Sequence, residues 1–546
     1  MQGARQAADN TARIRVQLAG AWPVAPSNRG PRPSAGKPEE NPRTGKTRVL
    51  HFDSLDGVRQ MARHVLAYFV LPNLPFWAAS SFSVMIPRAT INLDYLVVGL
   101  VALYVSNSAG MALLIGTFLV DVLMSTASYY YFSQHDLISS ARYLLQLPWG
   151  WTVAPATILL TVGLVLAAFV VWVAGPVSPQ NRHRVSFALS AVLGVLIVNG
   201  VAGWAHPDTL DGHKLATSTY RRLLLDVWHH EFGEQPPSEL LSVPSATAQL
   251  REGVSGGLPF AAPGLRRNFV LVLVESYGLM NDPESAFKLE APFHVPAIQA
   301  KYEIKTGTVG FHGATVAGEF RVLCGLQMEI ASSKFVRQVS GRCLPDLLEK
   351  QGYHTTAIHG FREVMFDRQW WYKDLGFDDT LFLENLRKQP GMHMCGGIFP
   401  GICDDDIVEL LRQKLVSSGD GRPQFFYWLT LNSHLPVQRS SAKSGLLACG
   451  SGNAANPDLD VCDWMALIYK VNQALAELCA APQLPSTEFI IVGDHAPPFL
   501  TSTRRNQFSQ TVVPFIDLVP EPPRRRQVQS PEFSLDHNVS VPMRGR

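Results

Sequence analysis

"FIIVGDHAPPF", residues 489–499, joins a short apolar run to an acid and an imidazole. Four apolar residues lead directly into Gly493, Asp494 and His495. A continuous apolar run bounded by Gly and Pro is typical of a strand that is buried on both faces of a sheet. The stretch therefore predicts that a carboxylate and an imidazole stand at the carboxyl end of a buried strand.

Three other short apolar runs have the same character: "NFVLVLV" (268–274), "TTAIH" (355–359) and "QFFYWLTL" (424–431). Helical patterns lie between them, such as "LPDLLEKQG" and "DWMALIYKVNQALAELC". Strands that alternate with helices indicate a mostly parallel sheet covered on both faces. We therefore predict an α/β domain with a mostly parallel central sheet over residues 268–520.

Each of the four runs ends in chemically active residues. Glu275 follows the first run, His359 ends the second, His434 closely follows the third, and Asp494 and His495 follow the fourth. In parallel α/β sheets the ligand crevice lies outside the carboxyl ends of the strands. The four ends therefore predict a metal site or an acid–base site at one edge of the sheet.

Glu275, Asp494 and His495 form a mixed oxygen and nitrogen ligand set, which suits a divalent ion such as Mn²⁺ or Zn²⁺, with Mg²⁺ as a third candidate. A nucleophile is expected in the Gly-rich stretch "GTVGFHGATVAGEFRVLCG" (307–325). There Thr315 lies near the start of a predicted helix, where backbone N–H groups favour an anion. The alternative role for Thr315 alone is that of a helix N-cap.

Residues 64–204 are overwhelmingly apolar and predict a transmembrane domain. A membrane helix needs about 20 apolar residues. We expect five spans, at 65–86, 93–107, 109–131, 151–175 and 185–204. Pro72 and Pro75 leave a kinked or interfacial first segment open as an alternative. Asp121 lies inside the third span, where we favour a helix–helix hydrogen bond over a contact with a lipid head group.

Orientation follows from the basic residues. The tail 1–63 and "NRHR" (181–184) both fall on the cytoplasmic side if the N-terminus is inside and five helices cross the membrane. We therefore expect a multi-pass membrane protein whose N-terminus is cytoplasmic and whose α/β domain is extracytoplasmic. No cleavable signal peptide is recognised, and the first span would itself serve as an uncleaved membrane-targeting signal.

The cysteines agree with an oxidising compartment. All seven lie between residues 324 and 479, and three pairs are close in sequence: Cys324 with Cys343, Cys395 with Cys403 and Cys449 with Cys462. Cys479 is left over. A zinc knuckle is the alternative, but C-x-x-C spacing does not occur.

The remaining segments are less informative. Residues 205–267 predict a connector in which "YRRLLLDVWHHEF" (220–232) either lies on the membrane surface or packs on the globular domain. Residues 1–63 and 521–546 are basic or Pro- and Arg-rich tails, the first expected to be disordered. A formal net charge of only +2 argues against nucleic acid as a partner.

Five stretches occur in the order typical of membrane-anchored enzymes of the alkaline phosphatase and sulfatase superfamily: "LVLVESYG", "GATVAGEF", "IHGFREVMFDRQWWYKDLGFD", "LTLNSHLPV" and "IIVGDHAPPF". Over about residues 265–520 the chain resembles lipoteichoic acid synthase and the glucan phosphoglycerol transferases. The phosphoethanolamine transferases are similar in architecture.

The resemblance implies a role for each site residue. Glu275, Thr315, Asp494 and His495 would hold the metal, and Thr315 would also be the nucleophile. His359, Arg368 and His434 would bind the phosphate or the head group. Phe366 stands where lipoteichoic acid synthase has Trp, so the head-group contact at this position differs.

The implied reaction transfers a phosphoglycerol head group from a membrane phospholipid, with phosphatidylglycerol favoured, through a threonine-linked intermediate to a glycan or lipid acceptor outside the cytoplasm. Phosphoethanolamine transfer is the alternative. A true sulfatase would need a C-x-P-x-R motif, and "CLPDLLEK" (343–350) lacks the Arg. A membrane scaffold without activity is the remaining hypothesis, which the intact ligand set disfavours.

Overall fold

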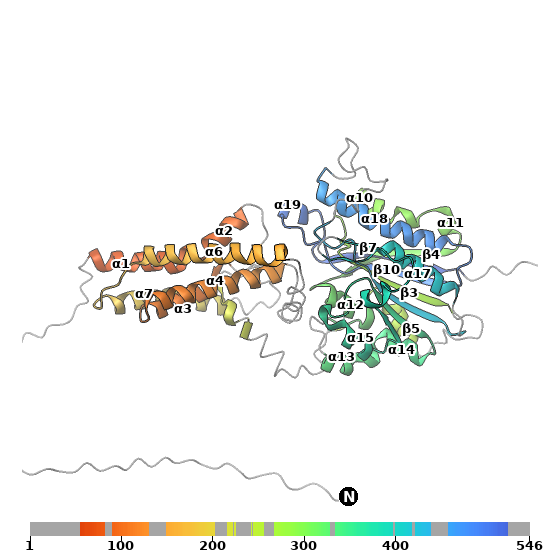
Figure 1. The fold of residues 1–546 in the computed structure, drawn as a ribbon, viewed down its shortest axis with the longest axis horizontal. Helices are drawn as coiled ribbons and strands as arrows, with labels where there is room; N and C mark the ends of the chain where they lie inside the picture. Colours follow the sequence, from red (N-terminus) through yellow and green to blue (C-terminus); the bar gives the residue numbers. More distant parts are fainter. Residues whose placement is uncertain are drawn as a thin grey trace, which may run out of the picture. The chain divides into compact units, whose positions relative to one another are not determined.

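A computed structural model describes the chain over residues 55–81, 90–129, 149–202, 216–221, 223–224, 242, 244–255, 267–327, 333–396, 399–417, 421–437 and 457–521 (Figure 1). These residues form a helical domain, up to residue 224, and an α/β domain from residue 242 onward. The predicted C-terminal tail, apart from Glu521, and most of the predicted N-terminal tail lie outside the described residues.

The helical domain combines apolar helices of 21 to 26 residues with shorter helical segments (Figure 1). Its elements are α1 (Leu55–Val65), the π-helix η1 (Leu66–Val70), α2 (Leu74–Ser81), α3 (Asp94–Ala102), α4 (Asn107–Tyr129), α6 (Trp149–Ala174) and α7 (Arg182–Ala202). The segments Ser108–Ala127 of α4 and Ala156–Ala174 of α6 are long and apolar enough to cross a membrane. They correspond to the third and fourth predicted spans, and the complete set of five stays a prediction.

The first two predicted spans differ from uninterrupted helices. A turn after η1 separates it from α2, at the position of Pro72, whose ring removes a backbone donor. The second span contains only the nine-residue helix α3. Nine helical residues rise about 14 Å, which is well short of the bilayer core of about 30 Å.

Asp121 is buried inside the helical domain and makes a hydrogen bond to a neighbouring helix, as its position favours. Its carboxylate accepts hydrogen bonds from Tyr95 Oη of α3 at 3.0 Å and from Thr219 Oγ1 at 3.2 Å. The start of the predicted connector therefore lies on this domain. Strand β2 (Ala216–Thr217) also pairs there in parallel with β1 (Ile91–Asn92).

We predict that Asp121→Asn preserves enzymatic activity and lowers the free energy of unfolding by about 1 kcal/mol, because the amide keeps one acceptor oxygen and loses the other. Asp121→Ala removes both acceptors and should be clearly less stable. Thermal unfolding in detergent and transfer assays on the three proteins check this. A large activity loss in a stable Asp121→Asn protein would instead favour direct participation in lipid binding.

The α/β domain is built on a seven-stranded sheet with the strand order β4-β11-β10-β3-β9-β5-β6. Five neighbouring strands are parallel, namely β10 (Thr487–Gly493), β3 (Asn268–Val274), β9 (Gln424–Leu429), β5 (His354–His359) and β6 (Asp379–Leu381). The strands β11 (Val512–Pro520) and β4 (Tyr302–Gly310) pair antiparallel at one edge. The mostly parallel sheet and the four strands predicted from sequence are thus confirmed.

Helices cover both faces of this sheet (Figure 1). One face carries α10 (Pro283–Glu290), α11 (Pro296–Gln299) and α18 (Leu459–Ala480), and the other carries α12 (Thr315–Cys324), α13 (Ser333–Val339), α14 (Leu344–Lys350) and α15 (Arg368–Asp374). The remaining elements are α9 (Ala248–Ser255), η5 (Ala291–Phe293), η6 (Ser340–Arg342), η7 (Met365–Asp367), α16 (Leu383–Leu386), β7 (Met394–Cys395), β8 (Gly401–Ile402), α17 (Asp404–Val416) and α19 (Ser502–Arg505). All residues of β3, β9 and β10 are buried, which explains their continuous apolar sequences.

Two of the expected disulfides are present, Cys324–Cys343 and Cys395–Cys403. Cys462 is also disulfide-bonded, and Cys449, its expected partner, lies outside the described residues. Cys479 is a buried thiol. Burial raises the pKa of this thiol well above its usual value, so the thiol stays protonated and unreactive.

Candidate metal centre and active site

The register of the two central strands brings the predicted metal ligands together. Val274 at the end of β3 pairs with Gly493 at the end of β10. The next residue of each strand, Glu275 and Asp494, therefore leaves the sheet beside the other. Both side chains are buried, at 4% and 1% exposure, so they face each other away from bulk water.

A strained turn holds the two carboxylates. Ser276 has the left-handed value φ 56°, which is uncommon for a residue with a side chain. In this conformation its backbone N–H donates to Asp494 Oδ1 at 2.7 Å, and its hydroxyl donates to Glu275 Oε1 at 2.9 Å. Such strain persists only where the surroundings enforce it, and it concentrates at functional sites.

Two glycines allow the elements to approach closely. A Cβ on Gly493 would clash with the carbonyl oxygen of Tyr277, and a Cβ on Gly318 would lie 3.1 Å from Asp494 Cβ. Gly318 belongs to α12, whose first residue is Thr315. The glycine therefore lets the helix that carries the predicted nucleophile pack directly on the turn of Asp494.

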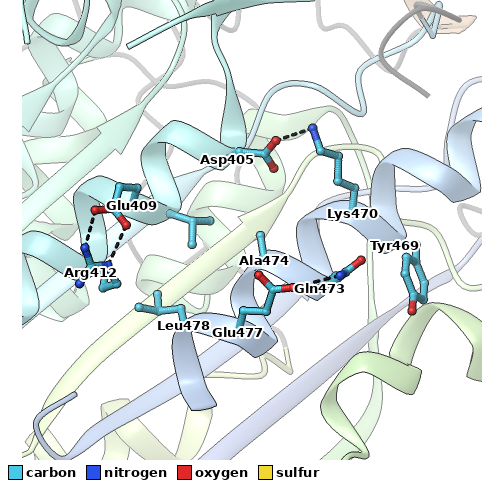
Figure 2. A pocket seen from close by; sticks show the side chains of 10 residues that line it. Asp405, Glu409, Arg412, Tyr469, Lys470, Gln473, Ala474, Glu477 and Leu478 are labelled. Carbon is cyan, nitrogen blue, oxygen red and sulfur yellow. Dashed lines mark hydrogen bonds and ion pairs between the residues drawn. The ribbon is translucent and has the colours of Figure 1, made fainter. Parts of the chain in front are cut away.

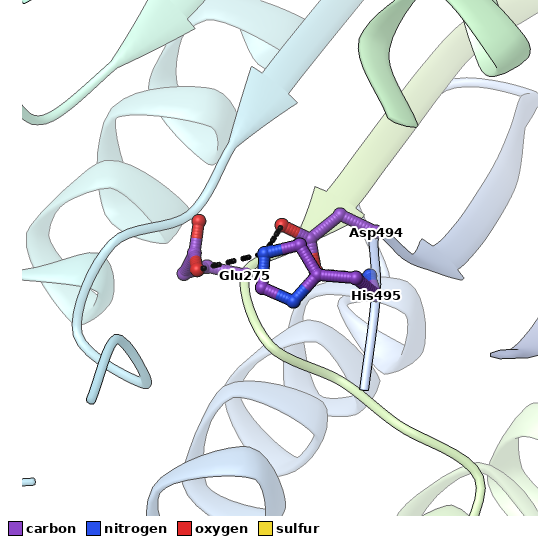
Figure 3. Close-up of side chains that lie close together, drawn as sticks. All are labelled: Glu275, Asp494 and His495. Atoms are coloured by element: carbon purple, nitrogen blue, oxygen red, sulfur yellow. Dashed lines mark hydrogen bonds and ion pairs between the residues drawn. The ribbon is translucent and has the colours of Figure 1, made fainter. Parts of the chain in front are cut away.

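Glu275, Asp494 and His495 offer three ligand atoms within 4.8 Å of one another. Figure 3 shows the imidazole of His495 facing both carboxylates. His495 Nε2 lies 3.3 Å from Asp494 Oδ2 and 3.7 Å from Glu275 Oε1. Two carboxylate oxygens and an imidazole nitrogen at this spacing are an ordinary donor set for Zn²⁺ or Mn²⁺.

The protonation of this cluster tests whether a cation fits. His495 Nδ1 lies 2.9 Å from the carbonyl oxygen of Ala496, which can only accept, so Nδ1 carries the proton and Nε2 presents a lone pair. Asp494 Oδ2, its near neighbour, is buried without a hydrogen-bond partner among the described residues. Two lone-pair atoms that face each other in a dry site are satisfied by a cation between them, so the residues fit a divalent metal.

The surroundings of each ligand shift its pKa. Burial lowers the pKa of the His495 imidazole, which favours the neutral form that binds metal. Burial, together with the Glu275 carboxylate, raises the pKa of Asp494. Burial alone would also raise the pKa of Glu275, but the imidazoles of His434 and His495 and two hydroxyl hydrogen bonds hold it below its usual value.

Thr315 stands at the centre of this cluster. Its hydroxyl donates to Glu275 Oε2 at 3.1 Å and lies 3.4 Å from His495 Nε2. As the first residue of α12, it is also at the positive end of a ten-residue helix. A phosphate that reaches Thr315 would meet both the metal ligands and the backbone N–H groups of the helix start.

A cavity of about 220 Å³ opens onto the cluster. Its wall contains six of the predicted site residues: Glu275, Thr315, His359, Arg368, His434 and His495. Apolar side chains lie among them, including Phe361, Phe366 and Phe399. The structure therefore gathers six of the seven predicted site residues at one cavity, with Asp494 just behind them; their individual roles stay predictions.

The histidines and Arg368 are held in defined orientations. Nδ1 of His359 donates to Leu429 O at 3.1 Å, and Nδ1 of His434 donates to Leu435 O at 2.6 Å, since both partners are carbonyls. The Nε2 atom of each ring is then the one left to accept. Arg368 donates hydrogen bonds from Nε and Nη2 to the carboxylate of Glu319. Its Nη1 makes no hydrogen bond within the described part of the chain.

Glu319 is a buried carboxylate that the sequence patterns did not single out. It accepts from Arg368 Nη2 at 2.9 Å, from Tyr427 Oη at 3.1 Å and from Tyr372 Oη. Burial and the Glu319 carboxylate raise the pKa of both tyrosines, so both hydroxyls stay protonated and donate. Glu319 lies one helical turn after Thr315 and therefore orients Arg368 at the cavity wall.

Arg321 is a second functional residue outside the predicted set. Its guanidinium is 1% exposed and donates to Gly493 O at 2.7 Å and to Asp494 O at 3.2 Å. Burial lowers the pKa of Arg321 to about 10, so it remains charged at neutral pH. It ties α12 to the turn that carries two of the ligands.

The segment after β9 is fixed by a reciprocal contact. Asp404, at the start of α17, accepts from the backbone N–H groups of Leu431 at 3.1 Å and Asn432 at 2.8 Å, and its own N–H donates to Asn432 Oδ1 at 2.7 Å. Ser433 Oγ in turn donates to Glu275 O at 2.5 Å. These bonds set the position of His434 relative to the cluster.

A larger groove of about 620 Å³ lies between α17 and α18 (Figure 2). Four of its five charged side chains form ion pairs, Asp405 with Lys470 and Glu409 with Arg412, and Glu477 accepts from Gln473 Nε2 at 3.0 Å. Its described lining contains no cluster of metal-ligating or nucleophilic groups. The smaller cavity at Thr315 is therefore the candidate active site.

A mostly parallel sheet with buried acidic and imidazole side chains at the carboxyl ends of its strands is typical of an alkaline-phosphatase-like α/β domain. Residues 267–537 match the family model described as Sulfatase, so the chain contains a sulfatase-family domain. No curated protein sequence matches the chain.

Three solved structures illustrate the structural similarity. The lipoteichoic acid synthase LtaP from Listeria monocytogenes is 14% identical, with 50% of this chain and 72% of that chain covered and a TM-score of 0.34. The Streptococcus pyogenes phosphoglycerol transferase GacH, in complex with sn-glycerol-1-phosphate, is 14% identical, with 51% and 77% covered and a TM-score of 0.36. The periplasmic domain of EcEptC from Escherichia coli, in complex with Zn, is 15% identical, with 47% and 73% covered and a TM-score of 0.30.

The sulfatase hypothesis can be tested at Cys343, the cysteine of the incomplete motif. Cys343 is fully buried and disulfide-bonded to Cys324, directly before α14. A cysteine in a disulfide cannot be converted to the formylglycine of a sulfatase. Membership of the family therefore does not make this chain a sulfatase through that residue.

We predict that Arg321→Met weakens Mn²⁺ binding about tenfold or more, because residues that orient metal ligands typically contribute 10- to 100-fold to affinity. Arg321→Lys, which keeps the charge but not the forked geometry, should be intermediate. Chelator competition measures the affinities, and thermal unfolding confirms that each protein is folded. Exposed Arg412→Met is the matched control. Unchanged affinity in folded Arg321→Met would contradict this role.

We also predict a pH effect on stability from Asp404, whose pKa burial raises to about 7. Since its unfolded pKa is about 3.9, the native state alone holds this proton between the two values, and stability falls as pH rises through that window. The slope for one group is at most about 1.4 kcal/mol per pH unit.

Asp404→Asn has no titrating carboxyl at this position, so it should not lose stability through this group as pH rises from 5 to 8, whereas the native protein should. The loss of one acceptor oxygen adds a destabilisation of the variant that does not depend on pH. Denaturant unfolding of both proteins at the two pH values checks the difference. An identical stability difference at both values would show that Asp404 does not titrate in this window.

Proposed function

We propose that this protein transfers a phosphoglycerol group from a membrane phospholipid to an acceptor hydroxyl, with Thr315 as the nucleophile. The observation that carries the proposal is the mixed lining of the cavity. Thr315, two of the candidate metal ligands and three further polar side chains share its wall with aromatic and aliphatic side chains. A lipid ester, which joins a phosphate to an apolar glycerolipid, suits a wall of both kinds.

The charge of the cavity favours a glycerol head group. Glu275 is the one carboxylate among the described lining residues, and its oxygens already face Thr315, Ser276 and His495. An ethanolamine ammonium would find no separate counter-ion there, whereas glycerol hydroxyls could bond to imidazole nitrogens. His359, His434 and Arg368 are well placed to hold the phosphate or the hydroxyls.

Glu275, Asp494, His495 and Thr315 would hold the metal. Bound there, a divalent cation lowers the pKa of the threonine hydroxyl and offsets phosphate charge. Thr315 loses its hydroxyl proton to solvent and attacks the phosphorus, a Thr315 Oγ–P bond forms, and the P–O bond to diacylglycerol breaks. Diacylglycerol takes up a proton and leaves as the alcohol. An acceptor hydroxyl next loses its proton and attacks the same phosphorus, the Thr315 Oγ–P bond breaks, and Thr315 takes up a proton.

The location proposed for this reaction is the outer side of a bacterial inner membrane. Two helices suited to span a membrane, in α4 and α6, support an anchor. The two described disulfides support an oxidising compartment for the α/β domain. The acceptor would be a glycan or lipid hydroxyl on that side. Phosphoethanolamine transfer is the second candidate, because the same phosphate-binding side would serve it.

We predict that Thr315→Ala lowers transfer from phosphatidylglycerol by at least about a thousandfold, since loss of a covalent nucleophile leaves only binding effects. Thr315→Ser keeps a hydroxyl and should retain measurable turnover. Diacylglycerol release from phosphatidylglycerol and from phosphatidylethanolamine micelles measures both the rate and the head-group preference.

Metal content and thermal unfolding of each variant show whether the site remains intact. Turnover of Thr315→Ala above a few per cent of the native rate would exclude Thr315 as the nucleophile. Faster release from phosphatidylethanolamine than from phosphatidylglycerol would replace the proposed donor by its alternative.

A further inference from the structure

We propose that Phe399 is a specificity-determining residue of the cavity, presented to the head group by a disulfide-closed hairpin. This hairpin consists of β7 and β8, joined by Cys395–Cys403. The inference rests on the proposed function, because it assigns a wall of the same cavity. It concerns residues that neither the sequence patterns nor the family resemblance singled out.

The hairpin is anchored to two of the segments that carry site residues. Ile402 N–H donates to the carbonyl oxygen of Gly360, the residue after His359, at 2.9 Å. A Cβ on Gly401 would clash both with that same carbonyl and with the side chain of Leu431. The absence of a side chain at Gly401 therefore lets the hairpin sit directly on the ends of β5 and β9.

The base of the hairpin is fixed as well. Cys403 N–H donates to His393 O at 3.0 Å, and His393 N–H donates to Asp406 Oδ2 at 2.6 Å. Asp404, the residue after Cys403, makes the reciprocal contact with Asn432 described above. Hairpin, α17 and the segment of His434 thus form one connected unit.

Among the described residues of the hairpin, Phe399 reaches the site. It lines the cavity and is half-buried. Its ring centroid lies 4.2 Å from that of His434 and 5.7 Å from that of Phe361, which it meets edge to face. The aromatic ring therefore restricts the His434 imidazole from one side and gives the cavity an apolar surface there.

Two effects follow for a phosphoglycerol lipid. First, the face of the Phe399 ring covers the carbon atoms of the glycerol units next to the phosphate. Second, the packing holds the His434 ring in place, so that its Nε2 faces the polar atoms of the head group. Both effects act on binding more than on the chemical step, so the loss should appear in KM rather than in kcat. The disulfide Cys395–Cys403 contributes to both effects because it closes the hairpin that carries Phe399.

The test uses the full chain in detergent with Mn²⁺ and micelles of phosphatidylglycerol, and it measures kcat and KM for diacylglycerol release. Phe399→Ala should raise KM about tenfold, the upper range for one aromatic contact, and leave kcat within about threefold. Phe399→Leu should lie between. The double variant Cys395→Ser/Cys403→Ser should raise KM in the same way. Phe287→Ala, an exposed Phe of α10 that does not line the cavity, is the matched control.

A second measurement does not need turnover. In the Thr315→Ala background, calorimetric titration with glycerol 3-phosphate should give an affinity that Phe399→Ala weakens by about tenfold. If Phe399→Ala changes neither the KM nor the affinity for glycerol 3-phosphate by more than a factor of two, the assignment of Phe399 is overturned. The proposed function would then still stand. A change confined to kcat would also overturn it.

The two proposals can fail separately. If no phospholipid releases diacylglycerol but Phe399→Ala still weakens glycerol 3-phosphate binding, the proposed function falls and the specificity role stands. If glycerol 3-phosphate does not bind and no phospholipid is cleaved, both are overturned.

Discussion

The site depends on one interaction, the buried contact of two carboxylates with one imidazole, formed by Glu275, Asp494 and His495. Burial and mutual repulsion raise the pKa of Asp494, and Asp494 Oδ2 lacks a hydrogen-bond partner among the described residues. An arrangement of this kind is costly unless a cation joins its members. The sheet register, the left-handed Ser276 and the close packing at Gly493 all serve to hold it. A divalent metal therefore explains features that would otherwise only destabilise the fold.

The helix α12 links this cluster to the substrate side. Thr315 at its start touches the ligands, Glu319 one turn later orients Arg368, and Arg321 fastens the helix to the Asp494 turn. The proposed nucleophile, the turn of Asp494 and the proposed phosphate-binding arginine are thus all contacted by one short helix. Such preorganisation is what a phosphoryl transfer site requires, because the protein contributes mainly position and charge. Beside His434, the hairpin with Phe399 gives the cavity an apolar surface, which the proposed lipid donor would meet.

Sequence patterns predicted the centre of the fold well. Strands β3, β5, β9 and β10 were recognisable because burial on both faces demands continuous apolar runs, and Glu275, Asp494 and His495 followed from the ends of those runs. Strands β4 and β11 were not predicted, since β4 is exposed along much of its length and has no such run. Glu319 and Arg321 were missed because their partners are distant in sequence, with Tyr427 lying 108 residues after Glu319. Phe399 stands in a short loop whose position depends on a disulfide and on Gly401, which no local periodicity reveals.

The central claim is that Thr315 carries the phosphoglycerol group between donor and acceptor. It is tested most directly by incubating the metal-loaded protein with phosphatidylglycerol in the absence of acceptor and analysing the peptide that contains Thr315 by mass spectrometry. The account predicts a phosphoglycerol adduct on Thr315 that disappears in Thr315→Ala and after removal of the metal with EDTA. Turnover of the lipid with an unmodified Thr315 peptide, or an adduct on another residue, would contradict it.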